Sequence, residues 1–122
     1  MEFMKTFEDL EVYKKAFDFS VQIFKLTSHN KINKNIASQL ERAALSISNN
    51  IAEGFELQSN KQLIRFLYIS KGSCGESRNI LAVAHKLHQV SDETYDRLRK
   101  KAVDISKQLS NFIKYLEKSE IR

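Results

Sequence analysis

The sequence contains no proline and only three glycines, so it is poor in the two residues that most often end helices and form tight turns. Long, uninterrupted helices are therefore expected. No apolar run approaches the roughly 20 residues that a membrane-spanning helix needs. The first residues, MEFMKTFEDLE, also lack the basic and then apolar order of a signal peptide. We therefore expect a cytoplasmic protein with no membrane segment.

Cysteine is almost absent too, because Cys74 is the only one and no disulfide can form within the chain. A lone thiol agrees with a reducing compartment. Metal-binding helical bundles often use a Glu-x-x-His motif, but no glutamate stands three residues before His85 or His88. Cys74 lies within a helical pattern without an assignable histidine base, so we interpret it as a buried structural thiol. The sequence therefore predicts no enzyme activity, no metal site and no cofactor.

Apolar residues recur at the three- and four-residue spacing of amphipathic helices along nearly the whole chain. In the first helix Tyr13, Phe17 and Phe24 form one apolar seam and a second lies beside it, so its apolar face is wide enough for more than one neighbour. Short connections favour antiparallel neighbours. We predict an all-α protein, an antiparallel up-down-up-down four-helix bundle, in which residues 1–122 form a single domain. The helices are expected near residues 7–28, 34–54, 60–88 and 92–118.

Residues that cap helix ends support these boundaries, because their side chains can bond to backbone amides that the helix leaves free. Two of the caps resemble capping boxes, in which a second side chain bonds back to the cap residue. Gly54 suits the left-handed residue that ends the second helix. The expected N-terminal caps are Thr6 with Asp9, Ser59 with Gln62, and Ser91.

The stretch SISNNIAEGFE, residues 46–56, is unusual because helix interiors disfavour asparagine and helix carboxyl ends repel acids. A polar seam with spacings of four, three and four residues runs into it. One interpretation is a solvated helix side with asparagines near a frayed end. The other is a polar network shared with another helix or another subunit. The seam and its border consist of Arg42, Ser46, Asn49, Asn50 and Glu53.

The network interpretation predicts two ion pairs between the second and third helices. If these helices are antiparallel, Arg42 lies roughly level with Glu76. Glu53 then lies level with Lys61 or Arg65. Glu76 falls in the register of apolar residues, where an unpaired carboxylate would be costly to bury.

The third helix contains GSCGES, residues 72–77, although a glycine inside a helix costs about 1 kcal/mol relative to alanine. Gly72, Ser73 and Cys74, with Gly75 and Ser77, form a patch of small side chains. Such a patch would let a neighbouring helix or chain approach closely. The alternative is a local kink or a break in the helix.

Basic residues outnumber acidic ones by 20 to 15, which gives a formal charge of +5 and a pI near 9.4. This balance favours polyanionic partners. Lys71, Arg78 and His85 recur at intervals of seven on one side of the third helix, where Glu76 is the only acid. Basic residues of the fourth helix are diluted by acids such as Asp104, so we interpret them as a solvated side. The candidate nucleic-acid-binding residues are Lys61, Arg65, Lys71, Arg78 and Lys86.

Three stretches, FEDLEVYKKA, SISNNIAEGFE and FLYISKGSCGES, make the chain similar to the bacterial four-helix-bundle proteins encoded within intervening sequences of the 23S ribosomal RNA gene. The resemblance spans nearly the whole chain, with the motifs in the family's order and spacing. It implies a helical bundle that assembles into a homopentameric ring, a role associated with ribosomal RNA, and no known enzyme activity. The accessory protein of diversity-generating retroelements is a similar bundle, whose pentameric barrel binds nucleic acid and a reverse transcriptase. That analogy implies a nucleic-acid-handling protein as a further partner.

The resemblance also assigns structural motif residues by position. Two departures concern the loop after the second helix, where Leu57 and Gln58 replace the arginines of many relatives, and Ser77, where relatives have an apolar residue. The first departure weakens the case for a phosphate site on this loop. The motif residues in this chain are Asn50, Glu53, Gly54, Gly72, Ser73 and Glu76, which join Arg42 and Asn49 of the polar seam.

Two functional hypotheses follow. In the first, a non-enzymatic homo-oligomer binds ribosomal RNA, another structured nucleic acid or a ribonucleoprotein through a basic surface repeated around a ring. In the second, the oligomer is a scaffold that presents helices to a protein partner without binding nucleic acid directly.

Overall fold

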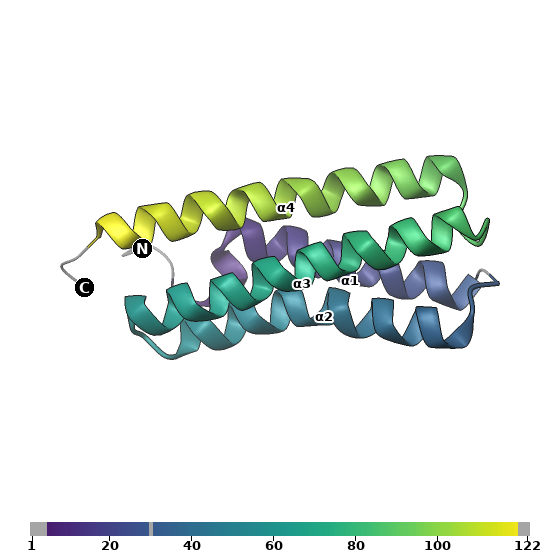
Figure 1. Cartoon of the computed structure of the whole chain (residues 1–122). Helices are drawn as coiled ribbons and strands as arrows, with labels where there is room; N and C mark the ends of the chain where they lie inside the picture. The colour runs from purple at the N-terminus through teal and green to yellow at the C-terminus, as the bar shows by residue number, and fades with distance from the viewer. Residues whose placement is uncertain (1–4, 30, 120–122) are drawn as a thin grey trace.

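The computed structural model describes residues 5–29 and 31–119, and in these ranges the chain forms four α-helices, one short 3-10 turn and no strand. Figure 1 shows that the connections alternate between the two ends of the molecule, so consecutive helices run antiparallel. The predicted all-α four-helix bundle is confirmed. The elements are η1 (Phe7–Asp9), α1 (Glu11–His29), α2 (Lys34–Glu56), α3 (Asn60–Lys86) and α4 (Asp92–Lys118).

The first helix begins later than predicted. The carboxylate of Asp9 accepts hydrogen bonds from the backbone N–H groups of Lys5 at 3.0 Å and Thr6 at 3.2 Å, as a capping box requires. This cap serves the short turn η1, because Leu10 is extended and separates the turn from α1. The buried Leu10 side chain anchors this entry to the core.

The other helix starts are capped by side chains that accept backbone N–H groups. Ser59 accepts from Gln62 at 3.4 Å and Ser91 accepts from Thr94 at 3.2 Å, as expected. Asn33 caps α2 because its side-chain oxygen accepts hydrogen bonds from the backbone N–H groups of Asn35 and Ile36, a cap that the sequence analysis missed.

Gly54 does not end the second helix, so that prediction is wrong. It is buried inside α2, which continues to Glu56, and the left-handed conformation belongs to Gln58, with φ of 54°. A Cβ atom at Gly54 would lie 2.7 Å from the Cβ of Phe66 and 3.2 Å from the Cδ1 of Leu63. Glycine is therefore needed because α3 passes closely over this turn of α2.

The core runs the length of the bundle and draws on all four helices. Each helix contributes apolar side chains at three- and four-residue spacing, as its sequence pattern predicts. Among the described helices, none combines the length and the apolar character needed to cross a membrane. The largest fully buried side chains are Phe19, Ile23, Leu40, Ile47, Ile51, Leu67, Cys74, Leu81, Leu98, Ile105, Leu109 and Leu116.

Candidate nucleic-acid interface

Positive charge is concentrated in one half of the bundle. α3 and α4 together contain twelve lysines and arginines against six aspartates and glutamates. α1 and α2 contain five of each, so they are neutral as a pair. Since α3 and α4 are neighbours in the bundle (Figure 1), their excess charge lies on adjacent surfaces. The α3–α4 half of the molecule therefore carries the excess positive charge of the helices.

The structure brings two of the predicted candidates to the border between α3 and α4. Lys71 and Arg78 are partly buried and lie in the same seven-residue row as His85. His85 stacks on Tyr95 of α4, with ring centroids 4.3 Å apart and planes 6° apart, which places this row on the side of α3 that faces α4. The Nε2 atom of His85 also lies 2.6 Å from the Asp92 carboxylate.

The other three candidates lie near the ends of α3 and do not join that row. Lys61 and Lys86 are exposed close to the two ends of the helix. Arg65 is exposed, donates to Gln62 at 3.4 Å, and places its guanidinium 5.5 Å from the ring centre of Phe66. The five candidates are therefore spread along α3 and do not form one cluster.

A row of exposed lysines on α4 was missed. Lys100, Lys107 and Lys114 are seven residues apart, which places them about 10 Å apart along one side of the helix and about 21 Å from first to last. The seven-residue spacing that identified the basic row of α3 would also have identified these lysines on α4. The sequence analysis missed them because it weighed all the acids of α4 against all its basic residues.

Two charged side chains of α4 form ion pairs with side chains of α1. Lys15 of α1 donates to Asp104 at 2.7 Å, and Lys101 donates to Asp18 at 3.2 Å. The hydrogen bond from Lys15 lowers the pKa of Asp104. Because Lys15 of α1 pairs with Asp104, this acid does not act on the basic residues of α4 alone, as a count along the helix assumes.

One of the two predicted ion pairs is present. Arg42 of α2 lies 3.9 Å from the Glu76 carboxylate of α3, with side chains 68% and 45% exposed. A pair so long and so exposed contributes little to stability. Within the described part of the chain, Glu53 is exposed and pairs with neither Lys61 nor Arg65.

The polar network between α2 and α3 is real but smaller than predicted. The hydroxyls of Ser46 and Ser73 lie 2.9 Å apart across the two helices. Asn50 donates to the Ser46 carbonyl at 2.8 Å and to its hydroxyl at 2.9 Å. Asn49 is exposed, like Glu53. The asparagine pair therefore has two explanations, since Asn50 supports the helix contact and Asn49 is solvated.

The two glycines of α3 are not explained by contacts inside the chain. The helix continues through both, so the alternative of a break in the helix is wrong. A Cβ atom at Gly72 would meet nothing within 4 Å, and one at Gly75 would meet only the Arg78 guanidinium at 3.9 Å. Neighbouring Cys74 is buried, and desolvation raises the pKa of its thiol to about 12. The thiol is therefore protonated at neutral pH, as expected of a structural cysteine.

No group of three or more histidine, cysteine, aspartate or glutamate side chains in residues 5–29 and 31–119 is arranged to hold a metal ion. The features that remain are an all-helical bundle with one neutral half and one basic half. These features define a class of small all-helical bundle proteins with an uneven charge distribution.

Comparison with known proteins identifies the family. Residues 8–111 match the 23S rRNA-intervening sequence protein family, and the chain belongs to it. The fold is shared with the crystal structure of a protein of unknown function from the S23 ribosomal protein family of Bacteroides thetaiotaomicron. That chain is 26% identical, with a TM-score of 0.79 over 84% of this chain and 98% of that one. No curated protein is similar enough to count as a match. The family resemblance stated from the sequence is confirmed.

Proposed function

We propose that the protein is a non-enzymatic homo-oligomer that associates with ribosomal RNA or a ribonucleoprotein by binding RNA through its α3–α4 half. The observation that carries the proposal is the charge distribution, with twelve basic against six acidic residues on α3 and α4 and balanced charge on α1 and α2. Membership of the 23S rRNA-intervening sequence protein family supports ribosomal RNA as the class of polyanion. The proposed binding requires no catalytic step and no cofactor.

The row of α4 lysines suits phosphate contacts. Helix α4 is 27 residues long, or about 40 Å, and holds Lys100, Lys107 and Lys114 on one side of a rigid support. Lys71 and Arg78 add two cations along the adjacent border. Contacts of this kind position RNA through its backbone and carry little sequence information. We therefore expect the protein to prefer structured RNA of a given shape to a particular base sequence.

Oligomer formation would multiply this weak surface. A single chain offers about five well-placed cations, whereas a pentameric ring, the assembly implied by the family resemblance, would offer several copies to one large RNA. Linked copies bind more tightly than one copy because later contacts form at high effective concentration. A nucleic-acid-handling protein as a further partner remains part of this proposal.

The experiment compares two charge-matched double variants. Lys107→Gln with Lys114→Gln removes two charges from α4, and Lys31→Gln with Lys34→Gln removes two exposed charges from the turn before α2 and its first residue. We expect the first variant to bind a structured 23S rRNA fragment more weakly, with the slope of log affinity against log salt reduced by about 2. The second variant should bind like the wild type. Equal affinity in both variants would contradict the assignment of the surface.

The alternative is a scaffold that binds a protein and no nucleic acid. It is favoured by exposed aromatic side chains on α1, of which Phe17 is 54% exposed. A defined protein partner that stays bound after nuclease treatment would support this alternative, while release of the partner with the RNA would support the first proposal.

A further inference from the structure

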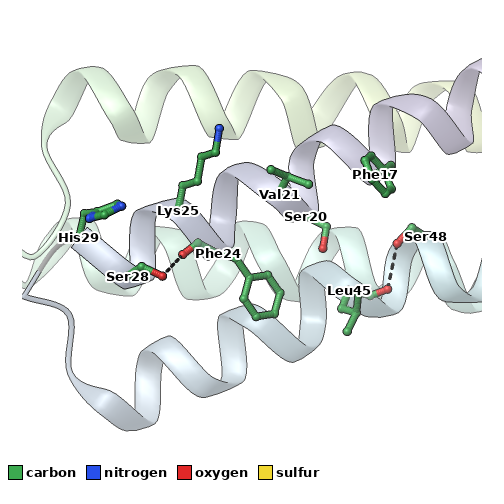
Figure 2. Close-up of a pocket in the computed structure, with 9 residues that line it drawn as sticks. All are labelled: Phe17, Ser20, Val21, Phe24, Lys25, Ser28, His29, Leu45 and Ser48. Carbon is green, nitrogen blue, oxygen red and sulfur yellow. Dashed lines mark hydrogen bonds between the residues drawn. The ribbon is translucent and has the colours of Figure 1, made fainter.

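An apolar groove lies between α1 and α2, with a volume of about 420 Å³. Figure 2 shows Phe24 extending from α1 toward α2, with Leu45 on α2 and Phe17 and Val21 further along α1. Each of these four side chains is between about 38% and 54% exposed. Contiguous apolar surface of this kind marks an interaction site more often than isolated exposed residues do.

Two of the three serines that line the groove form hydrogen bonds within their own helices. The hydroxyl of Ser28 donates to the Phe24 carbonyl at 2.7 Å, and that of Ser48 donates to the Leu45 carbonyl at 3.2 Å (Figure 2). These hydroxyls are therefore satisfied within their own helices. Among the described residues that line the groove, the ionisable ones are Lys25 and His29, and none is an acid.

A second apolar surface follows the outer side of α3. Ile69 and Val83 are each 43% exposed and stand fourteen residues apart, with Glu76 midway between them. One turn beyond Val83, Leu87 is 53% exposed. Because Glu76 reaches toward Arg42 of α2, this strip lies along the α2–α3 side of the bundle, whereas the groove lies along the α1–α2 side. A chain cannot place its own strip in its own groove.

The two surfaces are both apolar and carry opposite charges. Phe17 and Phe24 are seven residues apart, about 10 Å along a helix, while Ile69 and Val83 are fourteen residues apart, about 21 Å, with Glu76 midway between them. Lys25 acts on Asp18 only through its field and forms no ion pair within the described chain, while Glu76 is only partly compensated by Arg42 at 3.9 Å. The strip thus carries an acid, and the groove carries a base.

Gly72 fits the same arrangement. It lies on the strip between Ile69 and Glu76, is exposed, and has open space beside it. Glycine in this helix costs about 1 kcal/mol relative to alanine, and nothing inside the chain offsets that cost. A neighbouring helix that packs closely on the α3 backbone would do so.

We propose that the groove between α1 and α2 receives the outer strip of α3 from a second copy of this chain, so that copies join head to tail. This inference rests on the self-association in the proposed function and specifies its surfaces. A groove-to-groove contact would bring together two surfaces that carry basic side chains and no acid among their described lining residues, and it would leave the α3 strip uncovered. A head-to-tail contact covers both surfaces and repeats around a closed ring when the rotation per copy closes.

The test uses one charged substitution on each surface and one control. Phe17→Glu changes the groove, Val83→Glu changes the strip, and Leu57→Glu changes an equally exposed side chain that belongs to neither. Circular dichroism establishes that each variant is folded, and light scattering gives its mass. We expect the wild type and Leu57→Glu to have masses several times the 14.2 kDa of one chain, and the other two variants to be monomers.

An equimolar mixture of the two monomeric variants is the decisive sample. Each pair retains one intact groove and one intact strip, so a head-to-tail contact yields heterodimers of about twice the chain mass and nothing larger. Folded variants that stay monomeric when mixed, or a Val83→Glu variant that still assembles, would overturn the inference.

Binding of the same rRNA fragment separates this inference from the proposed function. Assembly that persists in both surface variants, together with RNA binding that depends on Lys107 and Lys114, would overturn the head-to-tail contact and leave the RNA proposal standing. Head-to-tail assembly of the wild type without RNA binding would overturn the RNA proposal and leave the head-to-tail contact standing.

Discussion

Replacing Gly54 with alanine tests the close approach of α2 and α3. In an unobstructed helix this change stabilises by about 1 kcal/mol, because alanine is the better helix former. Here the new Cβ would lie 2.7 Å from the Cβ of Phe66. That atom is attached to the backbone and cannot rotate away, so α3 must shift.

The steric cost outweighs the gain in helix propensity. Overpacking a core typically costs about 1–3 kcal/mol, and a contact as short as the one at Gly54 belongs near the upper end of that range. We therefore expect Gly54→Ala to lower the free energy of unfolding by about 2 kcal/mol. For a chain of this size the melting temperature should fall by roughly 6–10 °C.

Thermal unfolding followed by circular dichroism measures this effect, with Gly75→Ala as the matched control. The control position is helical and its Cβ would meet only the Arg78 guanidinium at 3.9 Å, so we expect it to be neutral or stabilising by up to about 1 kcal/mol. Gly54→Asn should be at least as destabilising as Gly54→Ala, although asparagine tolerates the left-handed region. A Gly54→Ala variant as stable as the wild type, or an asparagine variant that restores stability, would refute the packing explanation.

Two further predictions concern polar contacts. Asn50→Ala should lower the free energy of unfolding in urea by about 1 kcal/mol, because it removes both hydrogen bonds to Ser46. Glu53→Ala should change the free energy of unfolding little, because its side chain is solvated. The opposite order of stability would contradict this polar network. The lowered pKa of Asp104 means that its bond to Lys15 stabilises the fold above the ordinary aspartate pKa near 4 and that this contribution is lost as pH falls through the lowered value. Asp104→Asn should therefore be slightly less stable than the wild type at pH 7, and the difference should shrink as the pH falls through the lowered pKa of Asp104. A difference that stays constant in acid would exclude the ion pair as its cause.

The number and type of the helices could be predicted from the sequence because local signals agree with the global fold. Apolar spacing, the missing prolines and the caps Ser59 and Ser91 all point to the same four segments. Gly54 was misread because a glycine near a helix end can serve a left-handed turn or a close helix contact. Only the position of Phe66 on the neighbouring helix decides between the two.

The candidate surface was harder to predict for a related reason. Charges are visible in the sequence, but their partners on other helices are not. In the sequence, Asp104 is counted as an acid that offsets the basic residues of the fourth helix. In the fold, it accepts a hydrogen bond from Lys15 of α1. From the sequence, Glu53 is expected to pair with Lys61 or Arg65, yet its side chain is exposed and no such ion pair forms in the described part of the chain.

The most direct test of the central claim is the salt dependence of RNA binding by the wild-type protein. If one copy contacts RNA through the five cations Lys71, Arg78, Lys100, Lys107 and Lys114, affinity for a structured 23S rRNA fragment should fall roughly 500-fold between 50 and 200 mM salt, on a slope of about −0.9 per phosphate contact. Affinity that is unchanged across this range, or no binding at the lowest salt, would contradict the account.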